Sequence, residues 1–258
     1  FRVHIQQNLY EEKQIQNQKD IDYFRMIRDK ELRYMKYDDE VLSVNDYLQM
    51  LEMKQYDFQC ILEQFKGIIA GEKTEPDIPV KFSVYQRLEE GKKKPRTLVT
   101  LCPAERILTT ALIYELVETM GRRMHSYSYN LNFFNESGSV FMPWYDSWKR
   151  FQKDVESYLY LDIFKSYGLI KLDLSDFYDS IYVQAVFQQM QQLDSISRTE
   201  EVGKKINNIM SYLGSYTEKL MEQIKGKIRG VPQGPAYARV FAELFLTAVI
   251  DSFYHVFG

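Results

Sequence analysis

Hydrophobic residues at helical spacing run through much of the chain and predict a largely helical protein. In residues 43–71, apolar positions recur every three or four residues, which predicts one or two amphipathic helices. Residues 1–40 show the same spacing more loosely among charged residues, and we interpret them as a helical N-terminal arm. Further helices are predicted over residues 103–120, 144–161, 176–193, 199–224 and from 236 onward.

Strand patterns are confined to two stretches. Residues 85–100 predict a β-hairpin with its turn at residues 89–92. In residues 169–174 alternate side chains would fall on two faces of a strand, of which one is apolar and the other ends in Asp173. With a proline-containing loop at residues 72–79 and an irregular aromatic insertion at 122–142, the pattern predicts an α+β fold.

Composition narrows the class of protein. The 258 residues are 45% hydrophobic and 27% charged, as in ordinary globular proteins, and the net charge of −3 argues against a protein that simply coats nucleic acid. The sequence contains no apolar run of about 20 residues and no signal-peptide pattern, so we expect a cytoplasmic protein without a membrane partner. The 2 cysteines and 3 histidines lack the spacing of a zinc site. The 20 tyrosines could stack on bases or pack a core.

The strand that ends in Asp173 leads directly into a predicted helix. A carboxylate there can bind Mg²⁺, which takes oxygen ligands, and the adjacent Leu174 carbonyl could add a ligand. Ser175 or Asp176 would cap the helix, whose free amides offer a phosphate cradle. Tyr178 would project from the first turn beside a bound sugar. The alternative is that these acids are ordinary strand-end and capping residues.

Two glycines and two prolines fall within six residues just before the last predicted helix. Gly230 and Gly234 permit backbone geometries that a Cβ would forbid, and Pro232 stiffens the bend. Gln233 would then be held on a rigid elbow, where its amide could meet a sugar or a base edge. The alternative is a loop that merely joins two helices.

The tip of the predicted hairpin is strongly basic, with Lys94 and Arg96 as its most informative residues. A basic hairpin tip can close over a triphosphate, since a guanidinium binds phosphate through two hydrogen bonds and a lysine acts as a point charge. The alternative is a solvated tip.

Taken in order, these segments resemble the conserved blocks of reverse transcriptases, which are right-hand polymerases. Residues 94–99 are similar to the fingers hairpin that grips the incoming triphosphate. Residues 170–181, with Asp-Leu-Ser-Asp-Phe-Tyr-Asp-Ser-Ile at their centre, resemble the first palm motif, and residues 230–250 resemble the second. The similarity covers roughly residues 80–258.

The resemblance implies a division of the chain and a set of roles. Residues 1–78 would be a helical N-terminal extension, residues 79–168 the fingers with the aromatic insertion, and residues 169–258 a partial palm. Asp173 would be a catalytic metal ligand, assisted by the Leu174 carbonyl, with Mg²⁺ as cofactor and Mn²⁺ as the alternative ion. The residues implied to bind the deoxynucleotide are Lys94, Arg96, Ser175, Asp176, Phe177, Tyr178, Gln233 and Gly234.

The wording of the two palm blocks is closer to the prokaryotic defence-associated and abortive-infection branch than to retron or group II intron enzymes. This implies RNA-directed DNA synthesis from dNTPs in antiphage defence, with RNA as template or structural partner and DNA as product. A homo-oligomer or a partner protein is compatible with it. Two alternatives stay open: a non-catalytic RNA-binding or assembly protein on a degenerate polymerase fold, and a retron or group II type enzyme.

The chain departs from the family pattern in one respect. The third palm motif, an aromatic–x–Asp–Asp turn, and the thumb are absent from the 258 residues. Two-metal chemistry needs the carboxylates of that motif. We therefore expect a piece of a longer enzyme that does not polymerise alone.

Overall fold

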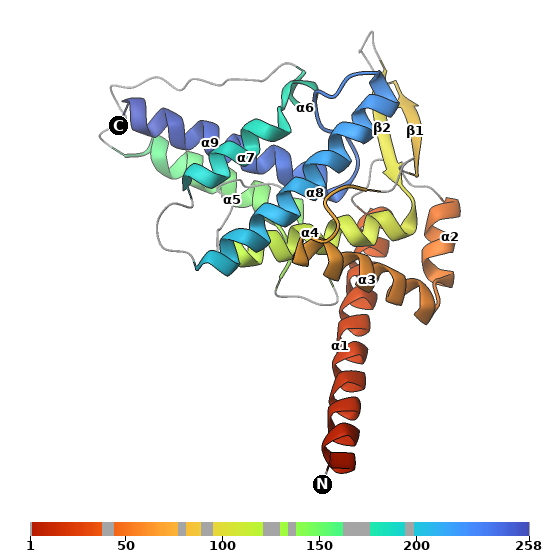
Figure 1. Ribbon diagram of the computed structural model, residues 1–258. Helices are drawn as coiled ribbons and strands as arrows, with labels where there is room; N and C mark the ends of the chain where they lie inside the picture. The colour runs from red at the N-terminus through yellow and green to blue at the C-terminus, as the bar shows by residue number, and fades with distance from the viewer. Residues whose placement is uncertain are drawn as a thin grey trace.

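The computed structural model describes residues 2–37, 44–76, 81–88, 95–120, 130–133, 138–161, 176–193 and 199–257. Within these ranges the chain is mostly helical, with one two-stranded antiparallel sheet, so the fold is a helix-dominated α+β mix (Figure 1). The elements are α1 (Arg2–Tyr37), α2 (Val44–Glu52), α3 (Gln55–Ala70), β1 (Phe82–Arg87), β2 (Arg96–Leu101), α4 (Pro103–Met120), α5 (Trp144–Leu159), α6 (Phe177–Ser180), α7 (Val183–Leu193), α8 (Glu200–Lys225) and α9 (Ala236–Phe257).

The N-terminal helices confirm the pattern read from the sequence. Helix α1 projects from the body and carries the N-terminus at its far end, while its later turns pack against α3 and α4 (Figure 1). Residues 43–71 contain two helices, α2 and α3, and α3 ends at Gly71 with φ 79°. Apolar residues of α1 and α3 belong to the same core cluster as those of α4, α8 and α9. The later turns of α1 and helix α3 are therefore part of the common core.

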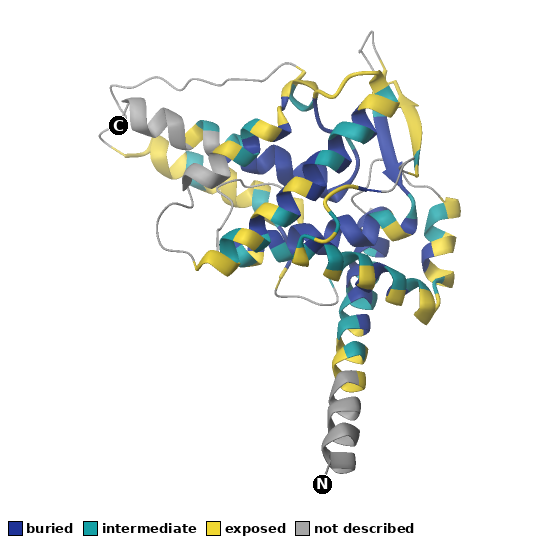
Figure 2. Ribbon diagram, viewed as in Figure 1, coloured by how far each residue is buried: buried dark blue, intermediate teal, exposed yellow. Residues whose placement is uncertain are grey.

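The predicted hairpin is formed by β1 and β2, in a register that pairs Phe82 with Leu101 and Arg87 with Arg96. Strand β1 is largely exposed, whereas β2 becomes buried from Leu98 onward (Figure 2). The turn predicted at residues 89–92 lies outside the described residues. Helix α4 starts at Pro103, as expected for a residue that lacks an amide hydrogen, and contacts α1, α3, α8 and α9.

A buried ion pair joins β2 and α4 to α1. The Arg106 Nη1 and Glu31 Oε2 atoms lie 3.2 Å apart, and the two side chains are 2% and 0% exposed. Arg106 also donates to the Thr100 hydroxyl at 3.3 Å, and the Thr110 hydroxyl donates to Glu31. Because breaking a buried pair leaves an uncompensated charge, this cluster fixes the base of the hairpin relative to the helices.

The predicted helix over residues 176–193 is wrong as a single element. It is divided into α6 and α7, with the break at Ile181, whose carbonyl accepts a hydrogen bond from the Gly230 amide at 3.1 Å. Helices α8 and α9 confirm the predictions for residues 199–224 and beyond 236, and the Thr199 hydroxyl caps α8. The strand predicted at residues 169–174 lies outside the described residues.

Helix α5 confirms the prediction for residues 144–161 but packs differently from the others. None of its sixteen residues, all of which the structure describes, is buried (Figure 2). Trp144 is 65% exposed. In the described part of the preceding insertion, Leu131 and Phe141 form an isolated antiparallel bridge. Among the described residues, no helix is long and apolar enough to cross a membrane.

Candidate nucleotide-binding site

Three segments that lie far apart in the sequence meet at one cavity of about 250 Å³: the hairpin, α6, and the elbow with the helix α9 that follows it. The hairpin contributes one residue, α6 two, the elbow two and α9 three. The lining residues are Arg96, Phe177, Tyr178, Gln233, Gly234, Arg239, Ala242 and Glu243. Five of these are residues for which the sequence predicted nucleotide contacts, so the structure brings the predicted segments together.

The elbow, which is formed by residues 230–235, is attached to strand β2 of the hairpin by a backbone hydrogen bond. The Val99 amide donates to the Gln233 carbonyl at 2.8 Å, and Leu98 and Gln233 form a parallel bridge. Gly234 has φ 126°, and a Cβ built there would lie 2.2 Å from the Val99 carbonyl oxygen. Only glycine permits this approach, which explains the glycine that follows Gln233.

The elbow is attached to α6 in the same way. The Val231 amide donates to the Tyr178 carbonyl at 2.9 Å, and the Gly230 amide donates to Ile181. Gly230 has φ 96°, and a Cβ there would lie 3.1 Å from the Tyr178 carbonyl oxygen. These backbone contacts place Tyr178 beside the elbow.

Helix α1 also contacts the elbow, and the sequence did not predict this contact. The Tyr34 hydroxyl donates to the Gly234 carbonyl at 3.2 Å, and the Tyr34 ring is fully buried. The Arg239 guanidinium carbon lies 5.3 Å from the centroid of the same ring. A residue from the N-terminal segment thus helps to hold both the elbow and a cation of the cavity wall.

The cavity is polar at several points. The Gln233 Oε1 atom is buried and has no hydrogen-bond partner within the described part of the chain. Arg239 and Glu243 are 6% and 4% exposed and stand one turn apart on α9, whereas Arg96 is exposed at the turn end of the hairpin. An uncompensated buried polar atom costs free energy, and a ligand that donates to Gln233 would recover it.

Arg239 and Glu243 were missed by the sequence reading. The signal was available, because they are charged residues within a helix whose other positions are mostly apolar. Charged side chains are rarely buried without a partner or a ligand.

Helix α6 starts differently from the prediction. Asp176 occupies the N-cap position with φ 48°, but its side chain is exposed and the predicted side-chain cap is not formed. The Phe177 ring packs against Tyr178 and Phe245, with centroids 5.7 and 6.1 Å apart. Aromatic packing against α9 therefore orients this short helix.

Two of the tyrosines belong to the core. Tyr237, in the first turn of α9, packs edge-on against Tyr216, and their ring centroids are 5.7 Å apart. Burial raises the pKa of Tyr237 and of Tyr216 above the ordinary value, so both hydroxyls stay protonated. Their rings are fully buried and cannot stack on a base, which favours the packing interpretation for these residues.

The two residues predicted to hold the metal, Asp173 and Leu174, lie outside the described residues. Lys94 and Ser175, which were predicted to bind the nucleotide, also lie outside them. Among the residues that the structure does describe, no group of three or more His, Cys, Asp or Glu side chains could hold a metal ion. The described wall offers one carboxylate, Glu243, so a magnesium site here depends on Asp173.

No family model, curated protein or solved structure matches this chain. The reverse-transcriptase resemblance therefore stays an expectation from the sequence motifs.

Proposed function

We propose that the cavity binds a deoxynucleoside triphosphate and that the protein performs reverse-transcriptase-type nucleotidyl transfer, associated with RNA, in bacterial antiphage defence. One observation carries the proposal. Arg96, the Phe177–Tyr178 pair and the Gln233–Gly234 pair, each assigned to the nucleotide from a separate sequence motif, line a single cavity.

The described side chains suit separate parts of a nucleotide. The exposed Arg96 guanidinium would bind phosphate oxygens through two hydrogen bonds, and the nearly buried Arg239 adds a second positive charge. The Tyr178 ring would lie against the sugar and disfavour a 2′-hydroxyl. The buried Gln233 Oε1 would accept a hydrogen bond from the sugar or the base.

The chemistry would be attack of a 3′-hydroxyl, or of a protein hydroxyl, on the α-phosphate, with release of pyrophosphate. Asp173 and the Leu174 carbonyl would hold Mg²⁺, which neutralises charge on the phosphates when it is bound. The residues of the cavity would contribute by positioning the triphosphate and by electrostatic stabilisation. The fold would then be the fingers and part of the palm of a right-hand polymerase.

The test is Mg²⁺-dependent dNTP incorporation by the natural gene product. Asp173→Asn should lower incorporation by at least about a hundredfold, because a neutral amide is a poor ligand for a hard cation. Asp179→Asn is the matched control, since this acid of the same segment is not among the residues that line the cavity.

The second arm tests the phosphate contact. Arg96→Gln should raise the KM for dNTP about tenfold, the loss expected for one charge-assisted contact of about 1.5 kcal/mol. Arg87, the cross-strand neighbour of Arg96, does not line the cavity, so Arg87→Gln should stay within twofold. Equal incorporation by wild type and Asp173→Asn would remove the polymerase mechanism and leave a non-catalytic RNA-binding protein.

A further inference from the structure

A second hollow, of about 500 Å³, is lined by the start of α7, the last turns of α8 and the chain that leaves α8. Its lining residues are Tyr182, Val183, Gln184, Glu218, Glu222, Gly226, Lys227, Ile228 and Arg229. We call it the α7–α8 hollow. It uses the same two segments as the nucleotide cavity, since Tyr178 lines one and Tyr182 the other, and the α8–α9 connector passes from the hollow to the cavity.

The hollow contains a preformed pair of planar groups. The Arg229 guanidinium carbon lies 4.7 Å from the centroid of the Tyr182 ring, and the Tyr182 side chain is 54% exposed. The Gly230 amide donates to the Ile181 carbonyl, so the residues next to the pair are joined by a backbone hydrogen bond. The Tyr182 carbonyl in turn accepts from the Ala185 amide at 3.0 Å and fixes the start of α7. A flat, partly exposed surface is thus held in place by the backbone.

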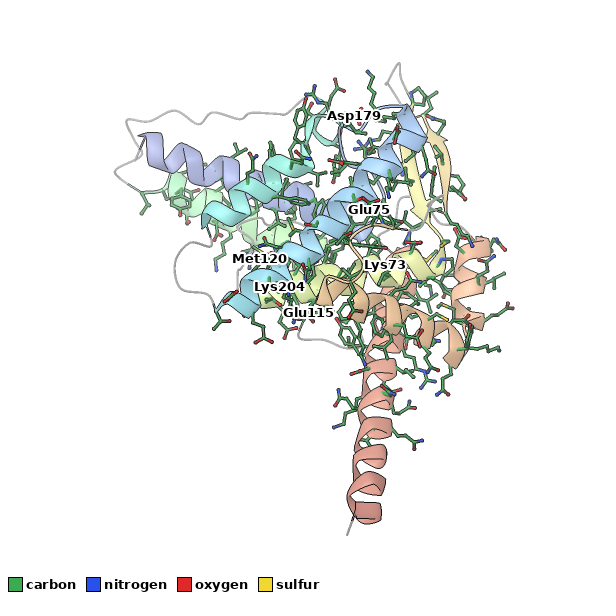
Figure 3. All side chains as sticks on the ribbon, viewed as in Figure 1. Lys73, Glu75, Glu115, Met120, Asp179 and Lys204 are labelled. Atoms are coloured by element: carbon green, nitrogen blue, oxygen red, sulfur yellow. The ribbon has the colours of Figure 1, made fainter. Side chains whose placement is uncertain are left out.

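The two cations that line the hollow differ from two nearby lysines of α8 in their ion pairs. Lys225 pairs with Asp179, which Figure 3 labels beside the end of α8, and Lys219 pairs with Glu75 at 2.6 Å. Lys227 and Arg229, in contrast, have no carboxylate partner in the part of the chain that the structure describes. An ammonium and a guanidinium with no counter-ion among the described residues can bind phosphate groups.

The part of the hollow formed by α8 is acidic. Glu218 and Glu222 lie on successive turns of α8, and Glu218 accepts a hydrogen bond from the Gln184 amide at 3.4 Å. Carboxylates repel phosphates but accept hydrogen bonds from the amino groups of bases. A strand that enters the hollow should therefore direct its bases inward and keep its backbone on the Lys227 side.

We propose that the α7–α8 hollow binds single-stranded nucleic acid, with a base stacked on the Tyr182–Arg229 pair and the adjoining phosphate held by Lys227. This rests on the proposed function, because the strand would lead along the connector to the nucleotide cavity. Stacking on an aromatic ring or a guanidinium needs an unpaired base with an open face, which an intact duplex does not offer. An acidic peptide fits less well, since Glu218 and Glu222 would repel it.

The first measurement is the affinity of the natural gene product for labelled 12-residue oligo(U) and oligo(dT), by fluorescence anisotropy. Tyr182→Ala should weaken binding about five- to a hundredfold, the range for loss of one base–aromatic stack. Tyr182→Phe keeps the ring and should stay within twofold. Tyr56 is 74% exposed on α3, away from the hollow, and Tyr56→Ala is the control for loss of an exposed tyrosine.

The second measurement separates charge from stacking. Lys227→Gln should reduce the slope of log affinity against log salt by about 0.7, the contribution of one phosphate contact in single strands. Arg229→Lys keeps the charge but loses the planar group, so affinity should fall while the salt slope stays the same. The RNA and DNA arms show which strand is preferred, and preference for either supports the proposal.

Three results would overturn the proposal. They are equal affinity of Tyr182→Ala and wild type, equal affinity for a 12-base-pair duplex and a single strand, and displacement of the oligonucleotide by an acidic peptide but not by unlabelled strand. Nucleotide binding is measured separately with dATP. Strand binding that depends on Tyr182 in a protein that binds no dATP would keep the hollow and remove nucleotidyl transfer, whereas dATP binding with strand affinity indifferent to Tyr182 would do the reverse.

Discussion

The connector between α8 and α9 has two halves with opposite surroundings. Residues 230–235 lie against β2, α6 and α1, and their backbone is hydrogen-bonded to all three segments. Residues 226–229 are exposed, and the Gly226 amide bonds only to the carbonyl of Glu222 in its own helix, within the part of the chain that the structure describes.

The contrast is sharpest at two glycines. Both have positive φ, 126° at Gly234 and 64° at Gly226. A Cβ at Gly234 would lie 2.2 Å from a backbone oxygen, whereas a Cβ at Gly226 would meet no atom within 4 Å in the part of the chain that the structure describes. Similar local chemistry thus serves two purposes. Residues 230–235 hold a site in a fixed geometry, whereas residues 226–229 turn the chain and leave their side chains open to a partner.

The largest expected effect is that of Gly234→Ala. The free energy of unfolding should fall by about 4 kcal/mol, since overpacking costs about 1–3 kcal/mol and a backbone conformation that L residues rarely adopt costs a similar amount. The Val99 carbonyl cannot move away without breaking the attachment of the elbow to β2. Urea denaturation followed by circular dichroism measures the loss.

Gly226→Ala is the matched control. Its Cβ would have room, so the cost should be limited to backbone strain of about 1 kcal/mol. Losses of equal size at the two glycines would show that the two halves of the connector do not differ in the way described.

The next effect in size is that of Tyr34→Phe. This change removes the hydroxyl that donates to the Gly234 carbonyl and should lower the free energy of unfolding by about 1–1.5 kcal/mol, the typical net value of a buried hydrogen bond. Tyr56→Phe, at an exposed position, should change it by less than about 0.5 kcal/mol. If the two variants are equally stable, the elbow does not depend on α1.

Part of this arrangement could be predicted from the sequence. The helices, the hairpin and the meeting of Arg96, Tyr178 and Gln233 were predictable, because periodicity, proline and glycine report on local structure and the motifs carried the resemblance. The local pattern also identified the elbow, because a close approach of two backbone segments favours glycine, as at Gly230 and Gly234.

Other features depend on contacts between distant segments. The break between α6 and α7 arises because the Ile181 carbonyl bonds to Gly230 rather than within a helix. The Tyr34 contact links residues 200 positions apart, and no local pattern signals it. Arg239 could have been noticed as a charge in an apolar helix, but its place in the cavity follows only from the packing of α9.

The smallest effect should come from Asp179→Asn, which removes the ion pair between α6 and the last turn of α8. The two side chains are 51% and 32% exposed, so solvent screens the pair and the loss should be at most about 0.5 kcal/mol. Thermal melts in low and high salt measure it, and 1 M NaCl should abolish the difference from wild type because it shortens the screening length to about 3 Å. A loss as large as that of Tyr34→Phe would mean that a side-chain pair, and not the backbone bonds of Gly230 and Val231, holds α6 beside the connector. The small effect expected here follows from the same backbone attachment that makes the effect at Gly234 large.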